Sequence, residues 1–150
     1  MAYFKTYLEL CTYFEGLTTT VTDLKGVTVG ADEEMLNQQA TRIQYPHLRV
    51  DTPEFSLVDD DDTPRTRYKF TLFVLTNDPK KTNAEANIKL STMATLCEKI
   101  IKRLYTDADA GKFDLVTGEK QGDAVRQWSG DNLYGWWFNI IIELYSDECA

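Results

Sequence analysis

Residues 65–75 read RTRYKFTLFVL, and apolar and polar side chains alternate along most of this stretch. A β-strand points successive side chains to opposite faces, so the pattern predicts a strand with one buried and one solvent-facing side. The side chains predicted to be buried are Tyr68, Phe70, Leu72 and Val74. The other face is predicted to carry Arg65, Arg67, Lys69 and Thr71, which makes it basic.

An acidic segment comes directly before this strand. Asp51–Asp62 contains six carboxylates and no lysine or arginine. Tyr45–Val50 is predicted to be extended, because Pro46 favours β geometry in Tyr45 before it. Phe55–Val58 continues the extended section beyond Pro53, and this proline indicates an edge strand or a kink. The segments on either side of 59–64 therefore predict an antiparallel hairpin with a charged connection.

The longest helix is predicted downstream of the strand. Thr82 and Glu85 form the T-x-x-E capping box, in which the two side chains satisfy free backbone N–H groups at a helix start. Apolar residues then recur at spacings of three and four, at Leu90, Met93, Cys97, Ile100 and Leu104. The cations expected in the last turns, where they complement the helix dipole, are Lys99, Lys102 and Arg103. The helix is predicted to end before Asp107–Gly111.

Shorter elements are predicted in the first third of the chain. A helix is expected over residues 3–17, with Gly16 as its stop, and residues 17–30 are expected to hold a short strand or an extended linker. A brief helix is predicted from Gly30 to Ile43. The buried face of the first helix is predicted to consist of Phe4, Tyr7, Leu8, Cys11 and Phe14.

The last third predicts β structure. Short strands are expected at Phe113–Val116 and Ala124–Trp128, and a final, central strand at Leu133–Tyr145. Its inward side chains are predicted to be Tyr134, Trp136, Phe138, Ile140, Ile142 and Leu144, and Trp137 must face the other side. The order of elements predicts one α+β domain over 1–150, a mainly antiparallel sheet with the N-terminal helix and the long helix packed on one face.

Composition limits the classes of function. With 16 lysines and arginines against 24 aspartates and glutamates, the net charge is −8, which disfavours tight binding to nucleic acid or anionic lipid. Cys11, Cys97 and Cys149 are far apart and contain no CxxC pair, so neither a disulfide framework nor a zinc site is expected. No secretion signal or membrane span is predicted, because Glu9 interrupts the apolar N-terminus and no apolar run approaches about 18 residues.

Patterns that indicate catalysis are weak. His47 is the only histidine, and we interpret it as an ordinary strand or loop residue. Ser129–Asp131 lacks the flanking glycines of a nucleophile elbow, and no glycine-rich phosphate loop is present. Asp107–Gly111 resembles the start of a calcium loop but lacks its glycine and its bidentate glutamate, so a helix-ending loop is predicted.

The run Asp59–Asp62 offers oxygen ligands for Mg²⁺ or Ca²⁺. Four adjacent like charges repel one another, and alternate residues of an extended chain point in opposite directions. A solvated hairpin tip is therefore the preferred interpretation. No catalytic residue, cofactor site or metal site is predicted from the sequence.

The chain contains two motifs, YPHLRVDTP at 45–53 and DNLYGWW at 131–137. In these motifs and in the order of its elements, it resembles small neck proteins that join head and tail in tailed bacteriophages. The most similar type is the tail terminator or tail completion protein. The resemblance implies a subunit without catalytic residues that forms a homo-oligomeric ring, usually a hexamer. It also implies partners among other virion proteins, such as the tail tube or the connector (portal), and a location in the virion after assembly in the host cytoplasm.

The resemblance further implies that sheet edges and one hairpin lie at subunit contacts. The basic face at Arg65, Arg67 and Lys69 would then meet the acidic tip of a neighbouring copy, which would set the register of the contact. The tip residues are Asp59, Asp60, Asp61 and Asp62. Alternatively, these aspartates would line the lumen of the ring, where negative charge lets DNA pass without adhering.

Two other classes remain open on sequence alone. A monomeric acidic binding module, such as an adaptor or an inhibitor, would capture a basic partner through its acidic loop. A carboxylate-based enzyme, such as a metal-dependent nuclease or a hydrolase, needs paired acids that converge in a pocket, whereas the acids here lie mainly at turns. The ring subunit is the preferred interpretation.

Overall fold

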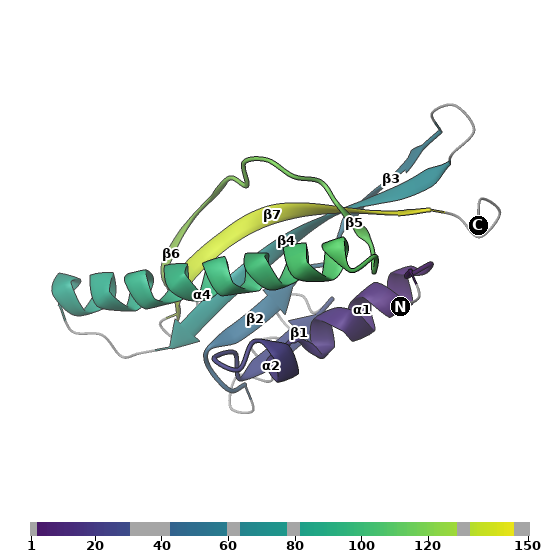
Figure 1. Cartoon of the computed structure of the whole chain (residues 1–150). Helices are drawn as coiled ribbons and strands as arrows, with labels where there is room; N and C mark the ends of the chain where they lie inside the picture. Colours follow the sequence, from purple (N-terminus) through teal and green to yellow (C-terminus); the bar gives the residue numbers. More distant parts are fainter. Residues whose placement is uncertain (1–2, 31–42, 60–63, 78–81, 129–132, 146–150) are drawn as a thin grey trace.

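A computed structural model describes residues 3–30, 43–59, 64–77, 82–128 and 133–145 (Figure 1). The helices are α1 (Tyr7–Glu15), α2 (Leu17–Thr20) and α4 (Asn83–Asp109). The strands are β1 (Gly26–Val29), β2 (His47–Val50), β3 (Glu54–Val58), β4 (Arg65–Asn77), β5 (Asp114–Leu115), β6 (Gly122–Trp128) and β7 (Leu133–Tyr145).

A seven-stranded sheet is organised around the pair β4 and β7. These strands are antiparallel from Arg65 opposite Tyr145 to Asn77 opposite Leu133. β2 and β3 pair with the other edge of β4, whereas β5 and β6 pair with the other edge of β7. Among the strands described, β1 and β2 form the only parallel pair. The sheet is therefore mixed but mostly antiparallel, and the central position predicted for the last strand is confirmed.

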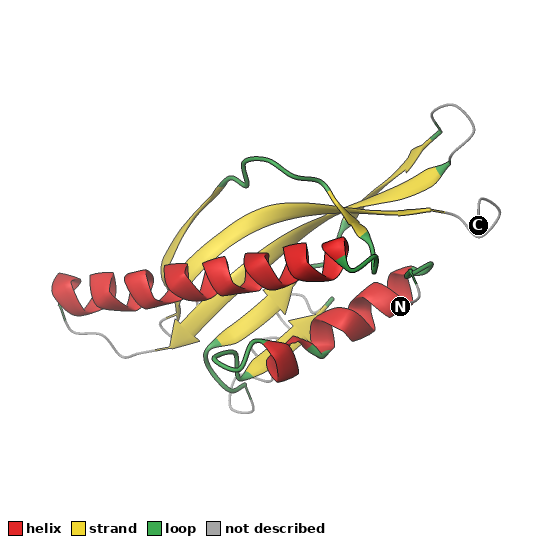
Figure 2. Ribbon diagram, in the orientation of Figure 1, coloured by secondary structure: helices red, strands yellow, loops and turns green. Residues whose placement is uncertain are grey.

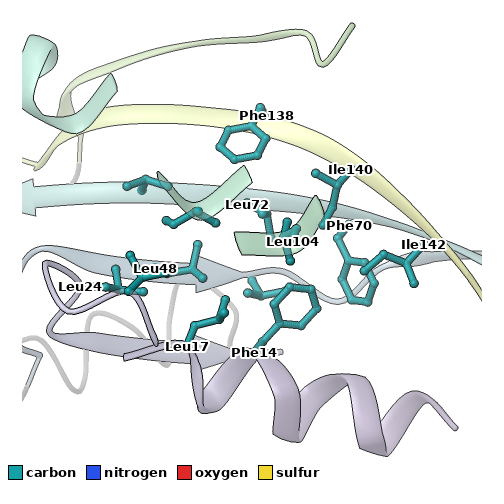
Figure 3. Packing of buried hydrophobic residues seen from close by; sticks show 14 of the residues in the cluster. Phe14, Leu17, Leu24, Leu48, Phe70, Leu72, Leu104, Phe138, Ile140 and Ile142 are labelled. Atoms are coloured by element: carbon teal, nitrogen blue, oxygen red, sulfur yellow. The ribbon is translucent and has the colours of Figure 1, made fainter. Parts of the chain in front are cut away.

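The N-terminal helix and the long helix lie on one face of this sheet (Figure 2). The alternation of β4 decides which face is covered, because Phe70, Leu72 and Val74 are fully buried. β7 contributes Phe138, Ile140 and Ile142 to the same core (Figure 3). The helices contribute Leu10, Phe14, Leu17, Met93, Leu96, Ile100 and Leu104. The predicted α+β fold, with an N-terminal helix and one long helix, is confirmed.

One side chain of the predicted buried face of the N-terminal helix lies in solvent, whereas Phe14 is fully buried and Phe4 and Tyr7 pack against the core as predicted. Leu8 is 73% exposed, whereas Leu10, which the predicted spacing did not select, is fully buried beside Phe14. The prediction for Leu8 was wrong because Leu10, Phe14 and Leu17 form an equally regular apolar series, and this second series faces the sheet. Gly16 has right-handed helical backbone angles, so the chain turns directly into α2 where a strand or a linker was expected.

The long helix begins as predicted but ends later. Thr82 caps it by accepting a hydrogen bond from the backbone N–H of Glu85 (3.1 Å). The helix continues two residues beyond Asp107 because the Asp107 side chain is buried and forms ion pairs with Arg103 and Lys112. The basic residues expected in the last turn consequently lie earlier in the helix.

The shorter predicted elements are found with shifted limits. The strands expected at Phe113–Val116 and Ala124–Trp128 are β5 and β6, and β3 and β4 form the hairpin predicted around 59–64. β1 is the short strand expected within 17–30. Several predictions fall wholly or mostly outside the described residues, namely the helix from Gly30 to Ile43 and the roles of Asp60–Asp62, Ser129–Asp131 and Cys149.

A close approach between β4 and β7 leads to a test of the sheet. A Cβ atom added at Gly135 would lie 1.9 Å from the carbonyl oxygen of Val74. A paired backbone cannot shift to relieve this clash as a flexible side chain can. Gly135→Ala should therefore lower the free energy of unfolding by about 2 kcal/mol or more. Gly16→Ala is the control, because its Cβ would meet nothing closer than 3.6 Å. Denaturant unfolding measures both variants, and equal stabilities would contradict this packing.

Candidate functional site: the hairpin arm

The β3–β4 hairpin extends beyond the helices as an arm (Figure 1). We define the hairpin arm as β3 together with Arg65–Lys69 of β4. β3 pairs with these residues, whereas β2 pairs with Leu72–Leu75 farther along the same edge of β4. No other strand in the described part of the chain pairs with β3. The arm therefore presents an open strand edge, a kind of surface to which other chains can add.

The helix-side face of the arm is apolar. Phe55 and Leu57 are 61% and 72% exposed, and they point to the same side because they are two residues apart on β3. The ring centroid of Phe55 lies 6.0 Å from that of Tyr68, which in turn lies 5.5 Å from that of Tyr7 on α1. The exposed pair thus continues a row of aromatic side chains from α1 onto the arm.

Sequence reasoning missed Phe55 and Leu57 as site residues. The available signal was their position at alternate places in a strand that Pro53 marks as an edge. Single exposed apolar residues are ordinary on protein surfaces, but an apolar pair on an open edge indicates a contact surface.

The opposite face of the arm carries the predicted basic residues. Glu143 of β7 binds two of them, with Oε2 lying 3.1 Å from Nε of Arg65 and 2.8 Å from Nη2 of Arg67. Glu143 is directly opposite Arg67 in the register of β4 with β7. Lys69 is exposed and lies opposite Glu54 of β3. Two of the three predicted cations therefore have an acidic partner within their own chain.

Glu143 was not identified from the sequence. It lies 76 residues from Arg67 along the chain, so only the register between the two strands reveals the pair. Asp59 is exposed directly after β3, whereas Asp60–Asp62 lie outside the described residues. Contact of the acidic tip with a neighbouring copy, or with a lumen, accordingly stays a prediction.

The Glu143 carboxyl group is held in its charged form. Burial alone would raise its pKa, but hydrogen bonds from Arg67 and Arg65 outweigh burial and lower the pKa below its ordinary value. The side chain is only 13% exposed, so the charge depends on these two partners. The cluster joins β4 to β7 within the arm.

A second surface feature lies between α4 and the connection from β5 to β6. We call it the α4 groove; its volume is about 550 Å³. Its apolar lining includes Ala94, Cys97, Ile101, Tyr105, Trp136 and Phe138. Trp136 is fixed there by a hydrogen bond from Nε1 to the backbone oxygen of Leu90 (2.8 Å). Trp137 packs with Phe73 in a separate cluster on the helix-free side, so the two tryptophans face opposite sides as predicted.

Of two residues with catalytic potential, His47 is buried and Cys97 is half-buried. His47 lies in β2 with Nε2 2.7 Å from Oγ1 of Thr28, and burial lowers its pKa to about 4. Its ring is therefore neutral at neutral pH. Burial likewise raises the pKa of the Cys97 thiol to about 12, so the reactive thiolate form is scarce.

Asp107 links α4 to α1. Its carboxylate accepts hydrogen bonds from the Tyr13 hydroxyl (2.6 Å) and from Nη2 of Arg103 (2.5 Å), and Nζ of Lys112 lies 3.4 Å away. Burial alone would raise its pKa, but these partners lower it below the ordinary value. No group of three or more His, Cys, Asp or Glu side chains able to hold a metal ion is found among the described residues.

No protein-family model matches the sequence, and no curated protein matches it significantly. Within the ranges that the structure describes, no helix combines the length and the apolar character needed to cross a lipid bilayer. A functional assignment therefore depends on the geometry of the chain itself and on the resemblance carried by its sequence.

The Glu143 cluster makes stability depend on pH in a defined direction. Because the pKa of Glu143 is lowered by folding, its charged form stabilises the protein above the ordinary glutamate pKa of 4.5. This contribution is lost as the pH falls through the lower pKa of the folded state. Glu143→Gln should therefore cost about 1 kcal/mol at pH 7, a modest loss because Arg67 is partly exposed.

The measurement compares wild type, Glu143→Gln and the control Glu119→Gln, whose side chain is exposed. Urea unfolding at a series of pH values should show wild type and Glu143→Gln converging in acid. A gap between them that stays constant down to low pH would contradict the ion-pair assignment.

Proposed function

We propose that this chain is a structural subunit of a bacteriophage virion, a ring-forming neck protein of the tail terminator or tail completion type. The observation that carries the proposal is the hairpin arm, whose open edge exposes Phe55 and Leu57. The resemblance in element order and in the two sequence motifs supplies the phage assignment. The role is not enzymatic, and the partners are further copies of the chain and other virion proteins, such as the tail tube or the connector.

An exposed apolar edge favours assembly over a monomeric state. Natural monomers usually protect open edges with charges, prolines or bulges. β3 begins beside Pro53 with the charged Glu54, but it still exposes Phe55 and Leu57 to solvent. Full burial of such a side chain contributes about 1.5 to 3 kcal/mol. A head-to-tail contact repeated around a rotation axis would bury this edge in every copy and leave no free end.

The ion pairs and the overall charge also support this role. Glu143 and Asp107 each bind two cationic side chains and join separate elements of the fold, which suits a rigid building block. The net charge of −8 would allow DNA to pass through a ring without adhering to its wall.

Replacing the apolar pair tests the assembly role. The double variant Phe55→Ser, Leu57→Ser should change the protein from ring to monomer, because it removes the apolar surface that would be buried between copies. The fold of the subunit should not change, since both side chains are exposed, and an unaltered far-UV circular dichroism spectrum would show this. Ile88→Ser is the matched control, because Ile88 is 64% exposed on α4 and lies outside the arm.

Light scattering after gel filtration and negative-stain imaging measure the outcome. A wild-type chain that stays monomeric at high concentration would contradict ring assembly and favour the acidic binding module. Absence of the chain from purified virions, determined by mass spectrometry, would contradict the virion role.

Charge reversal at the tip distinguishes the two roles proposed for the acidic residues. Replacing Asp59–Asp62 by lysine should block ring assembly if the tip meets a neighbouring copy, because like charges would then face each other. It should leave rings intact and slow genome release if the tip lines the lumen, because DNA would adhere to a basic wall. Ring imaging and infectivity measurements separate the two, and intact rings with normal infectivity would contradict both.

A further inference from the structure

The α4 groove has the dimensions of a binding site for a strand. Its lining combines side chains from two elements, Trp136 and Phe138 of β7 with Ile101 and Tyr105 of α4. Along α4 the lining extends from Ala94 to Tyr105, which corresponds to roughly 16 Å at 1.5 Å per residue. Its volume of about 550 Å³ lies within the usual range of about 300 to 1,000 Å³ for binding pockets.

The hairpin arm matches this groove in spacing and in chemistry. Phe55 and Leu57 lie about 7 Å apart on one face of a strand, so the groove is long enough to receive both. The basic residues of β4 do not interfere, because Arg65, Arg67 and Lys69 lie on the opposite face of the arm. The arm can thus offer a mainly apolar face, with Thr66 opposite Leu57, to an apolar lining.

The charges around the two surfaces are complementary. The lining of the groove contains two basic residues, Lys102 and Lys120, and one acidic residue, Glu98. Nζ of Lys120 is held over the groove, 3.3 Å from the hydroxyl of Tyr105 and 5.3 Å from the centre of its ring. The arm ends in the exposed Asp59. An apolar contact in the groove would therefore bring an acidic end toward a rim with an excess of positive charge.

The arm and the groove of one chain do not meet. The arm extends past the C-terminal end of α4, away from the body of the fold, whereas the groove lies between α4 and the β5–β6 connection (Figure 1). The occupant that has the right apolar face and charge is therefore the arm of a second copy.

We infer that the α4 groove of one subunit receives the hairpin arm of the next, with Phe55 and Leu57 packed against Ile101, Tyr105 and Trp136. The inference rests on the proposed ring assembly and identifies the two surfaces that form each contact. Because the arm and the groove are different surfaces, the contact is heterologous and repeats head to tail.

Filling the groove tests this contact without changing the arm. Ala94 is half-buried in the groove lining, so Ala94→Trp places a large side chain where the arm is expected. Subunit association should weaken at least about tenfold, a loss of about 1.4 kcal/mol, measured by analytical ultracentrifugation. Ile88→Trp, on the same helix but outside the groove, should assemble like wild type.

Disulfide trapping provides a second measurement that does not depend on the stability of Ala94→Trp. The starting variant has alanine in place of Cys11, Cys97 and Cys149. With Phe55→Cys and Ala94→Cys added, mild oxidation should give a ladder of covalent oligomers on a denaturing gel, because the acidic end of the arm faces Lys102 and Lys120 and Phe55 then lies toward the Ala94 end of the groove. Either cysteine alone, or Ile88→Cys combined with Ala94→Cys, should give no ladder.

The possible outcomes separate this inference from the proposed function. Intact rings of Ala94→Trp, with no disulfide between positions 55 and 94, would overturn the arm-in-groove contact but would not contradict ring assembly. Covalent dimers of Phe55→Cys alone would also overturn it, since two arms would then meet each other. A wild-type chain that never assembles would overturn both proposals together.

Discussion

The antiparallel pairing of β4 with β7 is the constraint on which the rest of the structure depends. The remaining sheet strands pair with one of these two or, in the case of β1, with a strand that does. The two faces of the pair are chemically different, so a slip of one residue would turn Phe70 and Ile140 from the core into solvent. The same register sets Glu143 opposite Arg67 and brings the backbone at Gly135 against Val74. One ladder thus determines the core, the ion-pair cluster and the place where no side chain can be added.

The hairpin arm exists because this ladder extends farther than the helices that cover it. Where α1 and α4 cover the sheet, apolar contacts hold β4 against β7. Within the arm, the Glu143 carboxylate bridges the strands through Arg65 and Arg67, and Tyr68 lies beside Tyr7. Removing one member of such a cluster leaves a partly buried charge without its partner, so ion pairs of this kind fix geometry more than they add stability. The result is an extended strand pair with an open edge.

The parts that sequence could predict are those governed by short-range interactions. The period of two around Phe70 and the cap at Thr82 need only neighbouring residues, and both predictions are confirmed. Leu8 was selected in place of Leu10 because two apolar series compete on one short helix, and only packing against the sheet chooses between them. For the candidate site, the basic face of β4 followed from alternation, but its partner Glu143 and the α4 groove did not. Both arise from segments far apart in the chain, which no local pattern brings together.

Charge and apolar contact would have separate effects in a ring of this protein. Each copy carries a net charge of −8, so copies repel one another over the Debye length of about 8 Å at physiological salt. A contact that forms against this repulsion needs short-range burial of apolar surface, which salt does not screen. Phe55 and Leu57 offer such surface, whereas Asp59 beside a basic rim would orient the approaching arm. A ring built in this way is favoured by rising salt, because salt reduces the repulsion and leaves the apolar contact intact. A ring held by ion pairs alone would behave in the opposite way, so the chemistry of the arm decides which kind of assembly the chain can form.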